Sequence, residues 1–242
     1  MEDSTKTFLD KIQGLNDKKI EVFSLSQKKK IECSPLSFKQ QKDLISTIAD
    51  GSVGALKFQK HINDLILANT GQDLKITDKL PIILALRVNA IGGDIKFDDV
   101  TVDFHQSVKK AEKLKFKDKI TIKGDVTINV EVPTLKQETQ VINTLIESIK
   151  KDGDAVAKSV GDIYTYEIAK YITSVVFGEE TLNFQDISVR DRIKIVENLP
   201  LSLNKQVVDF IQNIRKIEND ILVVDVDGEE KSFDIDVTFF DG

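Results

Sequence analysis

The chain has 242 residues, of which 40% are hydrophobic and 31% charged, and its formal net charge is −6, as in an ordinary globular protein of one large or two small domains. No apolar run reaches the roughly 18 residues of a membrane span, and the acidic start differs from a secretory signal, so we expect a cytoplasmic protein. One cysteine, Cys33, and two histidines, His61 and His105, exclude an internal disulfide and provide too few ligands for a zinc or other transition-metal site.

The first part of the chain is predicted to be helical, with two short strands in front. Residues 1–16 have only weak periodicity, and alternation around 20–22 and 31–33 predicts strands on either side of a basic turn at 28–30. Three helices follow, each with a capping residue at its start or a glycine at its end: residues 37–51, 55–71 and 77–93.

Between residues 94 and 132 the hydrophobic period changes from helical to alternating. The alternating segments are rich in β-branched residues, which indicates an antiparallel sheet with one face exposed to water. The predicted strands cover residues 95–97, 100–104, 120–122 and 126–132.

Helices are predicted again after Pro133. Thr134 and Gln137 form a capping box that opens one helix, and a further helix is predicted over residues 162–178. Ser188, with an acid three residues later, opens the next helix in the same way.

The last fifty residues contain the clearest local signals. Leu199-Pro200 ends one helix because proline disfavours helical geometry in the residue before it, and residues 203–218 have the spacing of an amphipathic helix. Asp227-Gly228 is a strong hairpin signal, which predicts strands at 221–226 and 232–237.

Together these elements predict an α+β fold, in which a helical bundle packs with a small antiparallel sheet and a C-terminal β-hairpin. We divide the chain into an N-terminal helical part with short leading strands (1–93), an antiparallel β segment (94–132) and C-terminal helices that end in a hairpin (133–242). We expect these three parts to form one compact unit.

Charge is distributed unevenly along the chain. From Glu218 onward there are nine acids against Lys231 alone, and from His105 to Lys123 there are seven lysines against two acids. Such asymmetry can orient a protein against a partner, and the alternative is that both runs are solvated faces.

Neither an enzyme nor a nucleic-acid-binding protein is indicated by any motif. The chain lacks a Gly-x-Ser-x-Gly, Walker or GxGxxG sequence, and we assign no catalytic, cofactor-binding or metal-binding residues. The lysine-rich run contains Phe116 but no series of stacking aromatics, and the net negative charge opposes duplex binding. A soluble enzyme of unrecognised class stays open as an alternative, because forty acids make chance carboxylate pairs common.

Several short motifs occur in the order found in one family. The chain resembles the baseplate protein family of T-even-like contractile-tailed bacteriophages, whose members include a baseplate hub component and a hub-assembly factor. The paired cysteines of some relatives are missing here. The motifs that carry the resemblance are Ser34–Lys42, Asp78–Arg87, Val130–Thr134, Asp186–Ser188, Leu199-Pro200, Phe210 and the closing Phe239-Phe240.

The resemblance implies a non-enzymatic phage tail protein without cofactors. It would act as a baseplate hub subunit or hub-assembly factor through contacts with other tail or hub proteins, including the tape measure, in the host cytoplasm during assembly and in the tail baseplate. The alternative is a transient tail-assembly chaperone for a tape-measure or hub protein that is absent from the virion. No membrane partner is expected, nucleic acid is disfavoured, and the oligomeric state does not follow from the sequence.

The candidate partner-docking residues are Phe239 and Phe240, together with Phe233 in the hairpin. Aromatic anchors surrounded by charge are typical of interface hot spots, and this pair lies in the acidic C-terminal segment. The alternative is that these rings fold back onto the protein's own core.

Overall fold

The computed structural model describes residues 18–46, 53–97, 100–152, 156–226, 228–233, 235 and 239. The predicted weak helix at 1–16 and the end of the first predicted helix at Gly51 lie outside these residues. The described helices are α2 (Phe38–Ser46), α3 (Gly54–Thr70), α4 (Lys79–Ile91), α5 (His105–Ala111), α6 (Leu135–Asp152), α7 (Val156–Ala169), α8 (Val189–Asn198) and α9 (Leu201–Leu222), with short 3-10 turns η2 (Ile76–Asp78) and η3 (Phe184–Asp186).

All described strands pair in antiparallel fashion, and the predicted α+β class is confirmed. Three sheets are two-stranded, and the fourth has the order β5-β6-β7-β8. The strands are β1 (Ile20–Ser24), β2 (Lys29–Cys33), β3 (Asp94–Phe97), β4 (Val100–Asp103), β5 (Lys119–Ile122), β6 (Thr127–Glu131), β7 (Ile172–Phe177), β8 (Glu180–Asn183), β9 (Val223–Val226) and β10 (Glu229–Ser232).

The β segment predicted as one sheet is divided between two. β3 pairs only with β4, while β5 and β6 join β7 and β8 from much later in the chain. The reason is helix α5, which is formed by the first part of the lysine-rich run. It lies between β4 and β5 in the chain and separates the two strand pairs.

The helix predicted over residues 162–178 is half wrong. It ends at Ala169, and residues 172–177 form strand β7 instead. The β-branched run Ile172 to Val176 favours a strand, and Gly178, with φ of 60°, turns the chain into β8. Pairing of β7 with both β6 and β8 stabilises the strand over the competing helical spacing.

Helix caps follow the sequence signals with one exception. The Ser37 and Thr134 hydroxyls accept hydrogen bonds from the backbone N–H groups three residues later, and Ser188 caps α8 in the same way. Gly71 ends α3 in the left-handed conformation, with φ of 67°. Thr77 is not a cap, because it lies inside the 3-10 turn that precedes α4.

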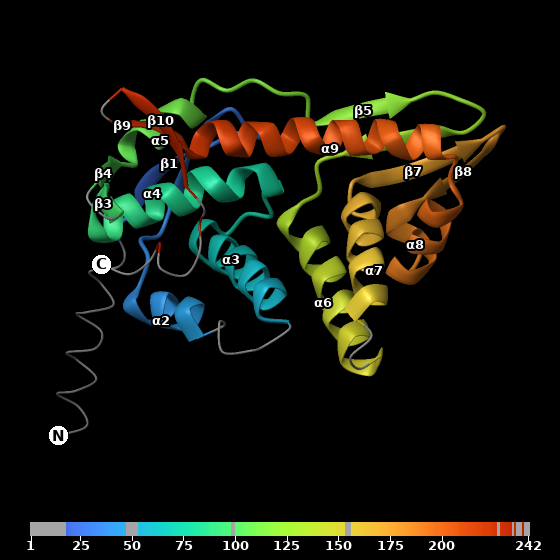
Figure 1. Cartoon of the computed structure of the whole chain (residues 1–242), viewed down its shortest axis with the longest axis horizontal. Coiled ribbons are helices and arrows are strands. Elements are labelled where there is room, and N and C mark those ends of the chain that lie inside the picture. Colours follow the sequence, from blue (N-terminus) through green and yellow to red (C-terminus); the bar gives the residue numbers. More distant parts are fainter. Residues whose placement is uncertain are drawn as a thin grey trace.

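Helix α9 organises the molecule. It runs parallel to the long axis of the molecule, with α3 towards one of its ends and α6, α7 and α8 towards the other (Figure 1). At 22 residues α9 is longer than the helix predicted at 203–218. It begins at Leu201, which the prediction left to the joint after Pro200, and it ends at Leu222, which the prediction placed in the first hairpin strand. Its buried stripe consists of Leu203, Val207, Phe210, Ile211, Ile214 and Ile221.

The strands of the C-terminal hairpin have other bounds than predicted. β9 begins at Val223, and β10 pairs Glu229 with Val226 and covers Glu229–Ser232, earlier than the second strand predicted at 232–237. Residues 234, 236 and 237 of that prediction lie outside the described residues. The tight turn itself is confirmed, because Gly228 has φ of 87°.

One large apolar cluster forms the core and draws residues from Val22 to Phe239. Its centre is α4, which buries residues around most of its circumference, including Ile82, Leu84 and Leu86. A helix that is apolar on all sides needs protein on all sides, and burial of each such side chain stabilises the fold by about 1.5–3 kcal/mol. The division into parts at residues 93 and 132 stays a prediction.

Candidate docking surfaces and the buried charge network

The C-terminal aromatic residues lie against the protein's own core. Phe239 is 2% exposed, and its ring packs edge-on against Phe104 with ring centres 5.3 Å apart. Phe233 contacts the same Phe104 ring at 5.9 Å, and Phe240 lies outside the described residues. The structure therefore brings Phe233 and Phe239 together around Phe104, while partner docking by Phe233, Phe239 and Phe240 stays a prediction.

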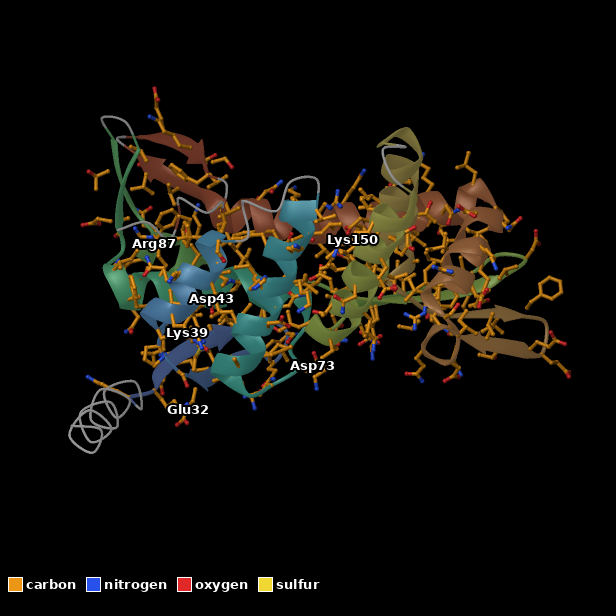
Figure 2. The ribbon with its side chains drawn as sticks, turned by 90° about the horizontal axis from the view of Figure 1, so that it is seen from below. Glu32, Lys39, Asp43, Asp73, Arg87 and Lys150 are labelled. Atoms are coloured by element: carbon orange, nitrogen blue, oxygen red, sulfur yellow. The ribbon has the colours of Figure 1, made fainter. Side chains whose placement is uncertain are left out.

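Arg87 of α4 ties the C-terminal end to the core. Its Nε donates a hydrogen bond to the Phe239 carbonyl at 2.9 Å, and its guanidinium lies 5.6 Å from the centre of the Phe239 ring. The guanidinium also donates to the carbonyl of Gly92, at the end of α4. Burial lowers the pKa of Arg87, and these acceptors compensate for the water it has lost. Figure 2 shows Arg87 in the half of the molecule that contains α2 and α4.

Asp78, at the start of the Asp78–Arg87 motif, is also buried, and it also forms hydrogen bonds with a distant segment of the chain. Its carboxylate accepts hydrogen bonds from the Ser24 hydroxyl at 2.9 Å and from the backbone N–H groups of Ser26 and Lys75 at 3.0 and 3.1 Å. The motif from Asp78 to Arg87 thus begins and ends with a buried charged side chain. Each of these side chains needs hydrogen-bond partners because it is buried, and each has a partner in a distant part of the chain.

Glu138 on α6 is a buried carboxylate, 3% exposed. It accepts from Lys79 at 2.6 Å, from Lys170 at 3.0 Å and from the Asn63 amide at 2.9 Å. Burial alone would raise the pKa of Glu138, but the charges of Lys79 and Lys170 outweigh it and lower that pKa to about 2.

The ion pairs continue from Lys170 to the surface. Burial opposes the charge of Lys170, yet Glu138 and Glu167 raise its pKa, and its ammonium lies 2.8 Å from Glu167. Glu167 in turn pairs with Arg215 of α9 at 3.2 Å. This network of Lys79, Glu138, Lys170, Glu167 and Arg215 joins α4, α6, α7 and α9, with the amide of α3 at its inner end.

A second carboxyl with a shifted pKa lies on α9. Burial raises the pKa of Glu218, which lines a cavity of about 290 Å³ with Lys79. The other described walls are mostly apolar, including Phe58 and Ile83, and no hydroxyl, thiol or imidazole lines them. A Ser-His or Cys-His type of nucleophilic site needs such groups, so the described walls of this cavity hold no site of that type.

A polar cleft of about 590 Å³ lies over the polar face of the four-stranded sheet. Hydrogen bonds from Thr121 to Asn129 and from Asn129 to Ser174, both 2.9 Å, cross that face. The adjoining start of α6 is satisfied internally, because the Lys136 N–H donates to Asp73 at 3.0 Å. The helix end therefore has its own carboxylate and needs no outside anion.

A groove of about 750 Å³ lies between α9 and the segment that leads into β5. Its apolar floor includes Phe116, Phe210 and Ile214, and Lys115 and Lys117 stand on one wall. From the sequence, these lysines are counted only as charge. Lys115 and Lys117 also alternate with Leu114 and Phe116, and such alternation predicts an extended segment with one buried face.

The histidines and the cysteine have ordinary surroundings. The His61 ring Nδ1 lies 2.9 Å from the Lys57 carbonyl, and that of His105 lies 2.7 Å from the Asp103 carboxylate. Burial raises the pKa of Cys33 to about 11, which makes its thiolate rare at neutral pH. Among the described residues no group of His, Cys, Asp and Glu could hold a metal ion, and no helix is long and apolar enough to cross a membrane.

Comparison with known proteins identifies a family. A model of the T4 bacteriophage base plate protein family matches residues 17–239 of the chain. No curated protein and no solved structure matches it.

Proposed function

Because the chain belongs to the T4 bacteriophage base plate protein family, we propose that it is a non-enzymatic baseplate component that works through contacts with other tail proteins. Within the baseplate we assign it to the hub, as a hub subunit or as a factor that assembles the hub. The observation that carries the proposal is the family match over residues 17–239, nearly the whole chain.

The buried charges support a structural role. A general acid or base at neutral pH needs a pKa near neutrality. Pairing moves the pKa of Glu138 down to about 2 and that of Lys170 upward, away from that range. These two residues are therefore suited to holding helices together and not to exchanging protons with a substrate.

A nonsense mutation in the gene, in the phage that encodes this chain, tests the proposal. We expect infected cells to accumulate no contractile tails until the wild-type protein is supplied in trans. Normal tails without the protein would overturn the proposal and favour the alternative of a soluble enzyme.

Mass spectrometry of purified virions then separates the two hub roles. Peptides of this chain in a fixed ratio to other baseplate proteins would support a hub subunit. A protein that tail assembly requires but the virion lacks would be an assembly factor or a transient chaperone.

Docking by the C-terminal aromatics needs a separate test. Phe239→Ala is unsuitable by itself, because Phe239 is buried and its loss would weaken the core. Phe240→Ala leaves the buried ring in place. We expect this variant to recover less of the partner tail proteins in a pull-down from infected cells, with equal recovery counting against docking.

A further inference from the structure

The segment from Lys113 to Ile120 carries four lysines, which alternate with Leu114, Phe116 and Asp118. Lys113, Lys115, Lys117 and Lys119 are exposed, whereas the residues between them are half-buried. Of these, Leu114, Phe116 and Ile120 pack against the main core. The four lysines are thus exposed at every second position from Lys113 to Lys119, and we call them the lysine row; Lys115 and Lys117 of this row line the groove.

The row borders the groove on α9. The segment runs beside α9 on its way into β5 (Figure 1). Gln206, Asp209 and Asn213, at helical spacing, form the α9 wall opposite Lys115 and Lys117, and apolar side chains form the floor between them. The volume of about 750 Å³ lies within the range of ligand pockets and can hold several apolar side chains of a bound peptide.

The acids nearest in the segment and on the opposite wall, Asp118 and Asp209, form no described ion pair with these lysines. None of the ion pairs found in the described part of the chain involves Lys113, Lys115, Lys117 or Lys119. Lys110, in the preceding helix, differs because its ammonium donates to the Val223 carbonyl at 2.6 Å. A partner that covers the groove would therefore meet a row of available cations beside an apolar floor.

We infer that this groove docks an acidic segment of another tail protein, with apolar anchor side chains on the floor and carboxylates facing the lysine row. The inference rests on the proposed function, since it names the chemistry of one baseplate partner. Charge complementarity identifies the occupant, because complementary potentials steer and select partners. A nucleic acid fits less well, since Phe116 packs on the core and the segment has no series of aromatic rings on which bases could stack.

Overlapping synthetic peptides that tile the phage's own tail proteins provide the probe. Fluorescence anisotropy with the full-length protein would measure their affinity. We expect the bound peptides to combine acidic and apolar residues, and we expect their affinity to fall as salt is raised. Failure of every peptide to bind, or selection of basic peptides, would overturn the inference.

Two variants locate the binding site. Lys113→Glu/Lys115→Glu/Lys117→Glu should weaken binding about 10- to 100-fold, because charge reversal at a rim changes the association rate. Its control, Lys28→Glu/Lys29→Glu/Lys42→Glu, makes the same charge change at other exposed lysines and should leave binding unchanged. Equal loss in both would show that only net charge matters and would overturn the inference.

A plug variant tests the floor without changing charge. Asn213→Trp places a large ring on the groove wall and should weaken peptide binding at least about tenfold, as expected when a central pocket is filled. The neighbouring Gln212→Trp is the control, because Gln212 is exposed and does not line the groove. Unchanged binding by Asn213→Trp, with normal folding by circular dichroism, would contradict docking in the groove.

Two other occupants are outcomes of the same experiments. A lysine-dependent complex with single-stranded oligonucleotides, without peptide binding, would overturn the inference in favour of nucleic acid. Self-association that depends on the same lysines would overturn it in favour of a second copy, docked through its acidic C-terminal hairpin.

The nonsense-mutant assay tests the inference in infected cells. Rescue by wild type but not by the groove variants would support the inference. Equal rescue by both would overturn the inference alone, whereas tails formed without any protein would overturn the proposed function.

Discussion

The charge network around Glu138 and the lysine row from Lys113 to Lys119 are two charged regions of the described structure that differ in pairing. Glu138 and Lys170 each contact two opposite charges within 3.0 Å. The lysines of the row enter none of the described ion pairs. Buried charge must be paired to be tolerated, whereas exposed charge need not be. The first region therefore holds the fold together, and the second is available to a partner.

The largest expected effect comes from breaking the buried network. Glu138→Ala would leave Lys79 and Lys170 without their shared carboxylate, and removal of one partner of a buried pair costs about 3–5 kcal/mol of unfolding free energy. Urea denaturation measures this loss. Glu147→Ala is the control, because Glu147 is exposed on the same helix and should change stability by less than about 0.5 kcal/mol. Similar losses in the two variants would remove the distinction between paired and available charge.

Acid should weaken the same network in a defined pH range. The pKa of Glu138 in the folded state is about 2, below the value of about 4.3 for an unfolded chain, so its contribution is complete above the unfolded pKa. That contribution is lost as pH falls from about 5 towards 2, and the shift corresponds to about 3 kcal/mol. The stability difference between wild type and Glu138→Gln, measured by urea denaturation across this range, should narrow accordingly. A difference that stays constant with pH would show that Glu138 carries no such charge coupling.

The sequence predicts local structure well where the cause is local. Caps at Ser37, Thr134 and Ser188 involve residues three positions apart, and each forms as predicted. Prediction fails where distant pairing decides, as for Ile172 to Phe177, whose spacing also fits a helix until β6 and β8 pair with it.

The two charged regions differ in the same way. The sequence could not predict that Glu138 is a buried and paired carboxylate, because its partners Lys79 and Lys170 lie 59 and 32 residues from it in the chain. The lysine row, in contrast, is visible in the sequence as a lysine at every second position from Lys113 to Lys119. What the sequence does not show is that α9 lies beside this segment and completes a groove.

Arg215 provides an intermediate case between the two regions. It pairs with Glu167 at 3.2 Å, but its side chain is 57% exposed, so water screens the pair. We expect Arg215→Ala to cost only about 0–1 kcal/mol of unfolding free energy. A double-mutant cycle with Glu167→Ala measures the coupling. A coupling as large as the loss in Glu138→Ala would mean that the network is cooperative out to the surface.

The smallest expected effect on stability belongs to the lysine row itself. Lys113→Glu/Lys115→Glu/Lys117→Glu should change the unfolding free energy by less than about 0.5 kcal/mol, because these side chains are exposed and the apolar residues between them are untouched. Urea denaturation measures the stability of this variant, and the peptide-binding assay measures its affinity. Weaker binding with unchanged stability would separate the partner-facing charge from the charge that holds the fold. If the triple variant loses as much unfolding free energy as Glu138→Ala, the lysines stabilise the packing of their segment on α9. The groove would then not be a docking site for an external partner.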